Sequence, residues 1–189
     1  MLSSNFYNSG SHKYKKQGEI HVYIPEIPNN SLTEEIKEIV ELSKKLEKEY
    51  DFEYAPPATE KEISAWESEH GITIPETYKD WLRFSNGSAI RSELAVFWGI
   101  KMIGSCDQFL PNDLVSIGEL IGDGEFLCFS KKTGKIIWED HGNIEEYDTF
   151  NSILVEIIRL IEGKSGLSQS SIDVLMSMVE ASRNNGEKN

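Results

Sequence analysis

Apolar residues recur every three or four positions in two long stretches of the chain, one near each end. The first stretch carries Leu32, Ile36, Ile39, Val40 and Leu46. The second carries Phe150, Ile153, Leu154, Ile157, Ile158 and Ile161. This spacing predicts two amphipathic helices with their apolar faces turned to a core. We expect Ser31 and Glu34 to form a capping box at the start of the first helix, and Asp148 to cap the second.

Two shorter helices are predicted over residues 60–85. Thr59 and Glu62 have the spacing of a capping box, in which a hydroxyl and an acid satisfy free amides at a helix start. Gly71 is a natural helix stop, and Pro75 suits the first helical position because its missing N–H costs nothing there. The aromatic side chains of this region, Trp66, Tyr78, Trp81 and Phe84, lie at helical spacing and are expected in the core.

Short apolar runs between the helices predict strands at residues 94–98, 114–117, 126–129 and 136–138, the last two forming a hairpin. The glycines at 118, 122 and 124 are expected in a turn before the third of these strands, and a further strand is expected at 21–24. After a Gly/Ser-rich connector at 163–171, a last helix carries Ile172, Leu175, Met176 and Val179.

These elements predict an α+β fold in which a central antiparallel sheet has helices packed at the N- and C-terminal ends. The length of 189 residues is that of one domain. We expect a flexible N-terminal segment at 1–18, a single domain at 19–183 and a flexible tail at 184–189.

The chain carries 19 Lys and Arg against 32 Asp and Glu, a net charge of −13. This charge argues against nucleic acid and anionic lipid as partners, and it favours a basic protein partner. The N-terminal residues lack the apolar stretch of a secretory signal, and no run of residues is long and apolar enough to span a membrane. We therefore expect a cytoplasmic protein in which Cys106 and Cys128 are reduced.

No catalytic, cofactor or metal motif is recognisable. The four histidines lack the spacing of a zinc site, and the glycines near 118–124 are not followed by the Lys-Ser/Thr pair of a phosphate loop. His141 follows Asp140 directly, but adjacent residues of an extended chain point to opposite faces. We expect His141 on a solvated loop and a protein that is not an enzyme.

Acidic residues concentrate near the predicted hairpin, at Glu139, Asp140, Glu145, Glu146 and Asp148, with no Lys or Arg between them. Two interpretations stay open: a solvated loop, or a docking surface for a basic partner. Like charges in proximity repel, so a purely structural role would favour mixed signs. We therefore predict a partner-binding surface formed by Asp123, Glu125, Glu139, Asp140, Glu145 and Glu146.

Taken together, several motifs resemble the opening pattern of the SUKH superfamily, the Smi/Knr-like proteins. They are the capped acidic helix from Thr59, then Gly71-Ile72, Ile74-Pro75, Tyr78, Trp81-Leu82 and Asn86-Gly87. The resemblance extends from about residue 32 to 162 through Gly118, the hairpin and the helix from Phe150. One departure is Ser88, where a second glycine is common, so the turn after Gly87 is expected to differ.

The resemblance implies an α+β fold without catalytic machinery or cofactor, and a protein-binding role. Bacterial members of the superfamily are typically immunity proteins that neutralise a polymorphic toxin, often a nuclease. Fungal members act as adaptors in cell-wall-synthesis signalling. The resemblance thus implies a toxin-binding protein or, alternatively, an intracellular regulator.

Overall fold

The computed structural model describes residues 14–16, 19–21, 23–46, 52–91, 94–120 and 125–162. Asp123, the connector at 163–171, the predicted helix at 172–179 and the tail at 184–189 lie outside the described residues. Two strands, β1 (Tyr14–Lys16) and β2 (Glu19–His21), pair with each other. They replace the strand expected at 21–24, and β1 falls within the segment 1–18 that the sequence marks as flexible.

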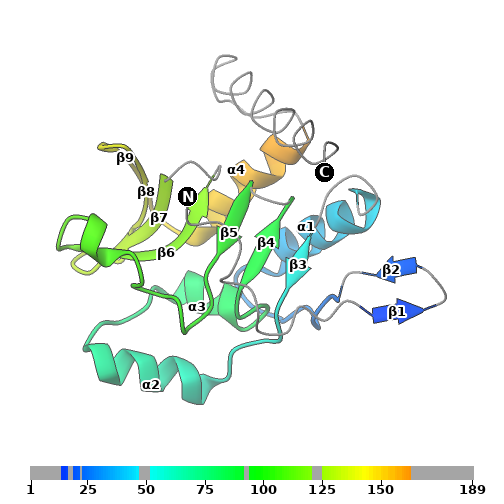
Figure 1. The fold of residues 1–189 in the computed structure, drawn as a ribbon, viewed down its shortest axis with the longest axis horizontal. Coiled ribbons are helices and arrows are strands. Elements are labelled where there is room, and N and C mark those ends of the chain that lie inside the picture. The colour runs from blue at the N-terminus through cyan, green and yellow to red at the C-terminus, as the bar shows by residue number, and fades with distance from the viewer. Residues whose placement is uncertain are drawn as a thin grey trace, which may run out of the picture.

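Seven antiparallel strands form the central sheet, and each pairs with the next one along the chain. In order they are β3 (Glu53–Tyr54), β4 (Ser88–Ile90), β5 (Ala95–Phe97), β6 (Leu114–Leu120), β7 (Glu125–Ser130), β8 (Ile136–Asp140) and β9 (Asn143–Tyr147). Neighbouring strands of an antiparallel sheet need only short connections, and the predicted hairpin is confirmed as β7–β8. The meander runs across the molecule from β3 to β9 (Figure 1).

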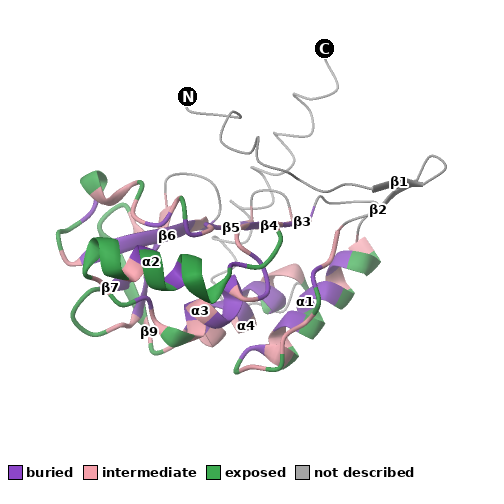
Figure 2. Cartoon of the chain, turned by 90° about the horizontal axis from the view of Figure 1, so that it is seen from below, coloured by how far each residue is buried: buried purple, intermediate pink, exposed green. Residues whose placement is uncertain are grey.

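In the described part of the chain, four α-helices accompany the sheet: α1 (Thr33–Leu46), α2 (Glu60–His70), α3 (Glu76–Leu82) and α4 (Phe150–Ile161). A short 3-10 helix, η1 (Asp107–Phe109), precedes β6. The α-helices lie on one side of the sheet, and buried residues lie where α1, α3 and α4 face it (Figure 2). The predicted α+β fold, with a central antiparallel sheet and helices at both ends of the chain, is confirmed. None of the described helices is both long and apolar enough to cross a membrane.

The two short helices begin and end largely as their sequence predicts. The Thr59 hydroxyl accepts from the amide of Glu62, and the Glu62 carboxylate accepts from the amide of Thr59, so this capping box is confirmed. Gly71 ends α2 with φ of 64°, a left-handed conformation that favours glycine. Pro75 stands one position earlier than predicted, at the N-cap of α3.

The capping predicted for the two long helices is wrong. The Ser31 hydroxyl donates to the Asp80 carboxylate instead of capping α1, while Asn30 accepts from the amide of Leu32. Asp148 does not cap α4 either. Thr149 is the N-cap residue, and the amide of Phe150 donates to the hydroxyl of Thr77 on α3. At α4 the accepting group thus comes from Thr77, a residue distant in sequence, whereas at α1 a distant carboxylate binds the hydroxyl that the local pattern assigns to the cap.

Gly118 lies inside β6, not in the expected turn, next to a register shift between Ser116 and Gly118. A Cβ at this position would lie 2.3 Å from the carbonyl oxygen of Val96 on the neighbouring strand. Only glycine allows this close backbone approach. Ser88, where the resemblance favours a glycine, is buried and begins β4 opposite Tyr54.

The aromatic residues of α2 and α3 lie in the core, as predicted. Trp81 is fully buried, and its ring contacts Phe84, Phe97 and Phe150 at centroid distances of 5.0–5.8 Å. The Tyr78 hydroxyl lies 2.6 Å from the carbonyl oxygen of Trp98 and 2.8 Å from that of Ile117. This buried hydroxyl ties α3 to the sheet where the chain leaves β5 and enters the second half of β6.

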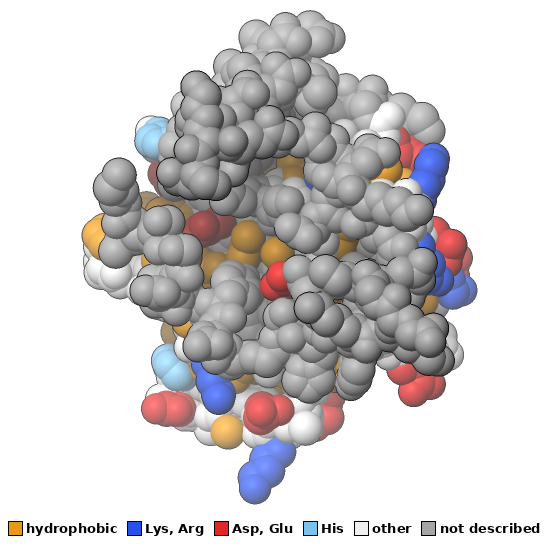
Figure 3. Space-filling view, turned by 45° about the vertical axis from the view of Figure 1, so that its right-hand side comes forward, with side chains coloured by type: hydrophobic (Ala, Val, Ile, Leu, Met, Phe, Trp, Pro, Cys, Tyr) orange, Lys and Arg blue, Asp and Glu red, His pale blue; other side chains and the backbone are white. Residues whose placement is uncertain are grey.

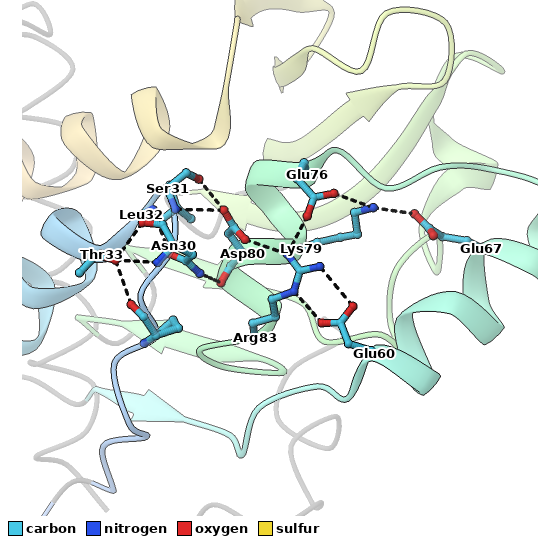
Figure 4. Close-up of polar contacts among 11 residues, drawn as sticks. Asn30, Ser31, Leu32, Thr33, Glu60, Glu67, Glu76, Lys79, Asp80 and Arg83 are labelled. Carbon is cyan, nitrogen blue, oxygen red and sulfur yellow. Dashed lines mark hydrogen bonds and ion pairs between the residues drawn. The ribbon is translucent and has the colours of Figure 1, made fainter.

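A network of charged side chains joins α2, α3 and the approach to α1 (Figure 4). Arg83 contacts Glu60, Glu76 and Asp80, each at 2.7 Å. Asp80, which is buried, also accepts from the amide and the hydroxyl of Ser31. These three carboxylates come from α2 and α3, so the network fixes the two short helices together.

Candidate partner-binding site

Strands β8 and β9 form a hairpin at one end of the central sheet. Asp140 pairs with Asn143, and the two residues between them, His141 and Gly142, have φ of 48° and 95°. Positive φ at both positions is typical of the type I′ turn, whose twist matches that of the flanking strands. Glu139, Asp140, Glu145 and Glu146 therefore belong to paired strands and not to the loop of the first interpretation, although Glu145 and Glu146 are exposed to solvent. The turn lies one residue before the position that Gly142-Asn143 indicates.

The register of the hairpin divides the predicted binding residues between the two faces of the sheet. Residues directly opposite each other share a face, and alternate residues of a strand point to opposite faces. Glu145 lies opposite Trp138 and therefore lies on the face that the helices cover. Glu125 lies on that same face, opposite Leu120. Glu139 and Glu146 lie on the other face. The predicted partner-binding residues therefore form two groups instead of one surface.

The two acids on the helix-covered face hold aromatic side chains. The indole N–H of Trp138 donates to Glu125 at 2.9 Å, and the hydroxyl of Tyr147 donates to Glu145 at 2.9 Å. Burial, with a further contribution from Glu145, raises the pKa of the Tyr147 hydroxyl, so it remains a proton donor. Glu125 and Glu145 therefore help to fix the positions of Trp138 and Tyr147 at the rim of the core.

The acids on the opposite face border an exposed apolar side chain. Ile144 lies directly opposite Glu139 and is 53% exposed. Glu139 accepts from the amide of Gly142 at 2.7 Å, and Glu146 pairs with Lys135 at 3.2 Å. The hydrogen bond with Glu146 raises the pKa of Lys135. This face of β9 thus presents an apolar residue between acids, a combination that suits an apolar anchor flanked by Lys or Arg in a partner.

His141 lies in the exposed turn, which agrees with its predicted solvated position. Its Nδ1 nevertheless lies 2.9 Å from the carboxylate of Asp140. The rule that neighbours point apart applies to extended backbone, whereas His141 has positive φ and turns its ring back. Its exposed side chain lacks the enclosed surroundings in which a His–carboxylate pair usually acts in catalysis.

Sequence reasoning missed two residues of this site. Ile144 gives no signal in the sequence, because an apolar residue in a strand is expected to be buried and only the register places it outward. Lys135 precedes β8 and acquires Glu146 and Asp148 as partners only when β9 folds back.

Acidic side chains also occur outside the β8–β9 hairpin. Figure 3 shows them at several places on the margin of one face, next to Lys or Arg.

The thiols are poor candidates for nucleophiles. Cys128 is fully buried, and burial raises the pKa of its thiol. Burial also raises the pKa of Cys106, which is partly buried. A thiol reacts as the thiolate, which a raised pKa disfavours. Among the described residues, no group of three His, Cys, Asp or Glu side chains is arranged to hold a metal ion.

The fold and the site define an α+β module with one helix-covered sheet and an exposed acidic hairpin at its end. The model of the SMI1 / KNR4 family (SUKH-1) matches residues 57–156, more than half of the chain. The chain belongs to this family, which confirms the resemblance drawn from its motifs. The matched region begins before α2 and ends within α4, so it includes the β8–β9 hairpin. A search of curated proteins gives no match to the sequence.

Proposed function

We propose that the chain is a non-catalytic protein-binding module that neutralises a basic toxin domain by occluding it. The observation that carries the proposal is the β8–β9 hairpin, in which Glu139 and Glu146 flank the exposed side chain of Ile144. Membership of the SUKH-1 family and the net charge of −13 support it. A nuclease domain is one suitable partner class, because such an enzyme presents a basic face to its phosphodiester substrate.

The physical basis is competition for a basic surface. An acidic protein associates quickly with a basic one, and salt weakens the attraction. A stable complex of this kind buries about 1,600 Å² in total, which the hairpin can supply only in part. Adjoining parts of the surface would complete the interface. No bond in the partner is made or broken, so one copy of the chain inactivates one toxin.

The alternative function is an intracellular regulator or scaffold in cell-wall-synthesis signalling, with several weaker partners. The neighbouring open reading frame distinguishes the two. A large secreted toxin encoded beside the chain supports immunity, and a wall-synthesis enzyme supports regulation.

The direct test co-expresses the chain with the toxin domain encoded beside it and measures survival and complex formation. The variant Glu139→Gln/Asp140→Asn/Glu145→Gln/Glu146→Gln should protect poorly. Its matched control is Glu34→Gln/Glu35→Gln/Glu38→Gln/Glu41→Gln on α1, which changes the net charge equally at the opposite end of the molecule (Figure 1). Equal protection by both variants would show that the hairpin does not carry binding. Absence of protection by the unaltered chain would contradict the immunity function itself.

A further inference from the structure

A shallow apolar hollow lies on the helix-covered face of the sheet, between α4 and residues in or next to β5, β6, β8 and β9. It is lined by Leu94, Leu120, Trp138, Tyr147, Ile153, Glu156, Ile157 and Leu160. Seven of these side chains are apolar or aromatic, and Glu156 is the one acid among them. Leu94, Trp138 and Tyr147 are only partly buried, although they pack against the main core. Burying the remaining exposed part of these side chains would be favourable.

The C-terminal segment, residues 163–189, begins close to the hollow and is long enough to reach it. Helix α4 ends at Ile161, one residue after Leu160 of the hollow, and residues 163–189 follow. Their sequence carries Ile172, Leu175, Met176 and Val179 at the spacing of one helical face. The connector 163–171 can span about 30 Å when extended. This reach exceeds the length of α4, about 18 Å, so the segment can return along α4 to the hollow.

We propose that the C-terminal segment 163–189 docks its apolar stripe into this hollow and covers Trp138. Tethering favours this occupant over a separate molecule, because attachment next to the hollow gives the segment a high effective concentration there. Charge favours it as well. The segment has three acidic and three basic residues, so it brings no net negative charge to a rim that already holds Glu125, Glu145 and Glu156. The docked segment leaves the opposite face of the β8–β9 hairpin open.

The fluorescence of Trp138 measures whether the segment covers the hollow. The other three tryptophans, Trp66, Trp81 and Trp98, are at most 7% exposed, so acrylamide quenching of fluorescence reports chiefly on Trp138. The full-length variant Leu175→Asp/Met176→Asp should show stronger quenching and a red-shifted emission. The control Ser177→Asp adds one negative charge, half the change of the double variant, on the opposite side of the predicted helix and should behave as the unaltered chain does. Far-UV circular dichroism checks the fold, and Leu175→Ala/Met176→Ala replaces the Asp pair if that variant unfolds.

A synthetic peptide of residues 163–189 should bind the Leu175→Asp/Met176→Asp chain and reverse its change in quenching. The same peptide with both Asp substitutions should have no effect. Unchanged quenching in the substituted chains would overturn the proposal. Quenching of the unaltered chain that depends on its concentration would also overturn it, since a second copy would then be the occupant.

Discussion

The guanidinium of Arg83, just after α3, lies 2.7 Å from the carboxylate of Glu60 at the start of α2. The contact joins residues on consecutive helices, and Arg83 extends it to Glu76 and to the buried Asp80. The hydrogen bond with Glu60 is the main reason that the pKa of Arg83 is raised. The same contact lowers the pKa of Glu60, and contacts with Lys79 and Arg83 lower that of Glu76.

Replacing Arg83 should lower stability and also change its dependence on pH. Arg83→Gln leaves the buried Asp80 without its cation, so we expect a loss of about 1–3 kcal/mol at neutral pH. The lowered pKa values of Glu60 and Glu76 stabilise the fold above their ordinary value of 4.5, and this stabilisation is lost as the pH falls below it. The variant should therefore lose less stability than the unaltered chain on acidification. Urea unfolding from pH 7 to pH 3 measures both effects.

The control for Arg83 is Lys44→Gln, which removes an exposed pair with Glu41 on α1. Pairs of this kind contribute about 0–1 kcal/mol. A loss as large as that of Arg83→Gln would show that general charge balance, not the contacts of Arg83, controls stability.

Two tryptophans on adjacent helices should both be required for stability, although to different extents. Trp81→Ala should cost about 3–5 kcal/mol, because Trp81 is fully buried among aromatic rings. Trp66→Ala should lie at the low end of that range, because Trp66 is 7% exposed and stacks on His70 at the end of α2. Chemical unfolding gives both values. Losses of only a fraction of a kcal/mol would contradict the core position of these rings.

Gly118 should resist even the smallest substitution. A Cβ there would lie 2.3 Å from the backbone oxygen of Val96, so Gly118→Ala must separate β5 from β6 and should cost about 3 kcal/mol. Gly142→Ala is the informative comparison. A Cβ added at Gly142 would have no neighbouring atom within 4 Å, but the backbone φ of Gly142 is 95°. This substitution should cost about 1 kcal/mol through backbone conformation alone. If thermal melts show equal losses, the close approach of the strands is not what requires glycine at 118.

The α2–α3 unit shows which features a local sequence pattern can predict. The groups that cap α2 come from Thr59 and Glu62, three residues apart, so their spacing was sufficient. The capping prediction at Ser31 failed because Asp80, 49 residues away, binds the hydroxyl. The candidate site shows the same limit. Its acidic composition could be read directly, but the separation of Glu139 from Glu145 depends on strand register, and the contacts of Lys135 depend on how β9 folds back.

Metal removal should leave the protein unchanged. The sequence lacks metal-ligand spacing, and the described residues contain no group of three potential ligands. Melting temperatures with and without EDTA should therefore agree. A clear decrease with EDTA that one divalent ion reverses would contradict this prediction.

The last prediction concerns which face of the β8–β9 hairpin binds the basic partner. Glu125 and Glu145 hold Trp138 and Tyr147, whereas Glu139 and Glu146 border the exposed Ile144. We therefore expect Glu139→Lys/Glu146→Lys to slow association with the partner, and more so at low salt, since exposed charges act mainly by steering. Ile144→Ala should instead speed dissociation, because an apolar anchor acts after contact is made.

Glu145→Lys is the control from the other face, and its effect on association should be smaller than that of either Glu139→Lys or Glu146→Lys alone. Single substitutions are compared because they change the net charge equally. Stopped-flow association at two salt concentrations, with thermal melts to check the fold, gives the comparison. Equal slowing by all three single variants would mean that the partner responds to the overall charge of the hairpin and not to the face that carries Ile144.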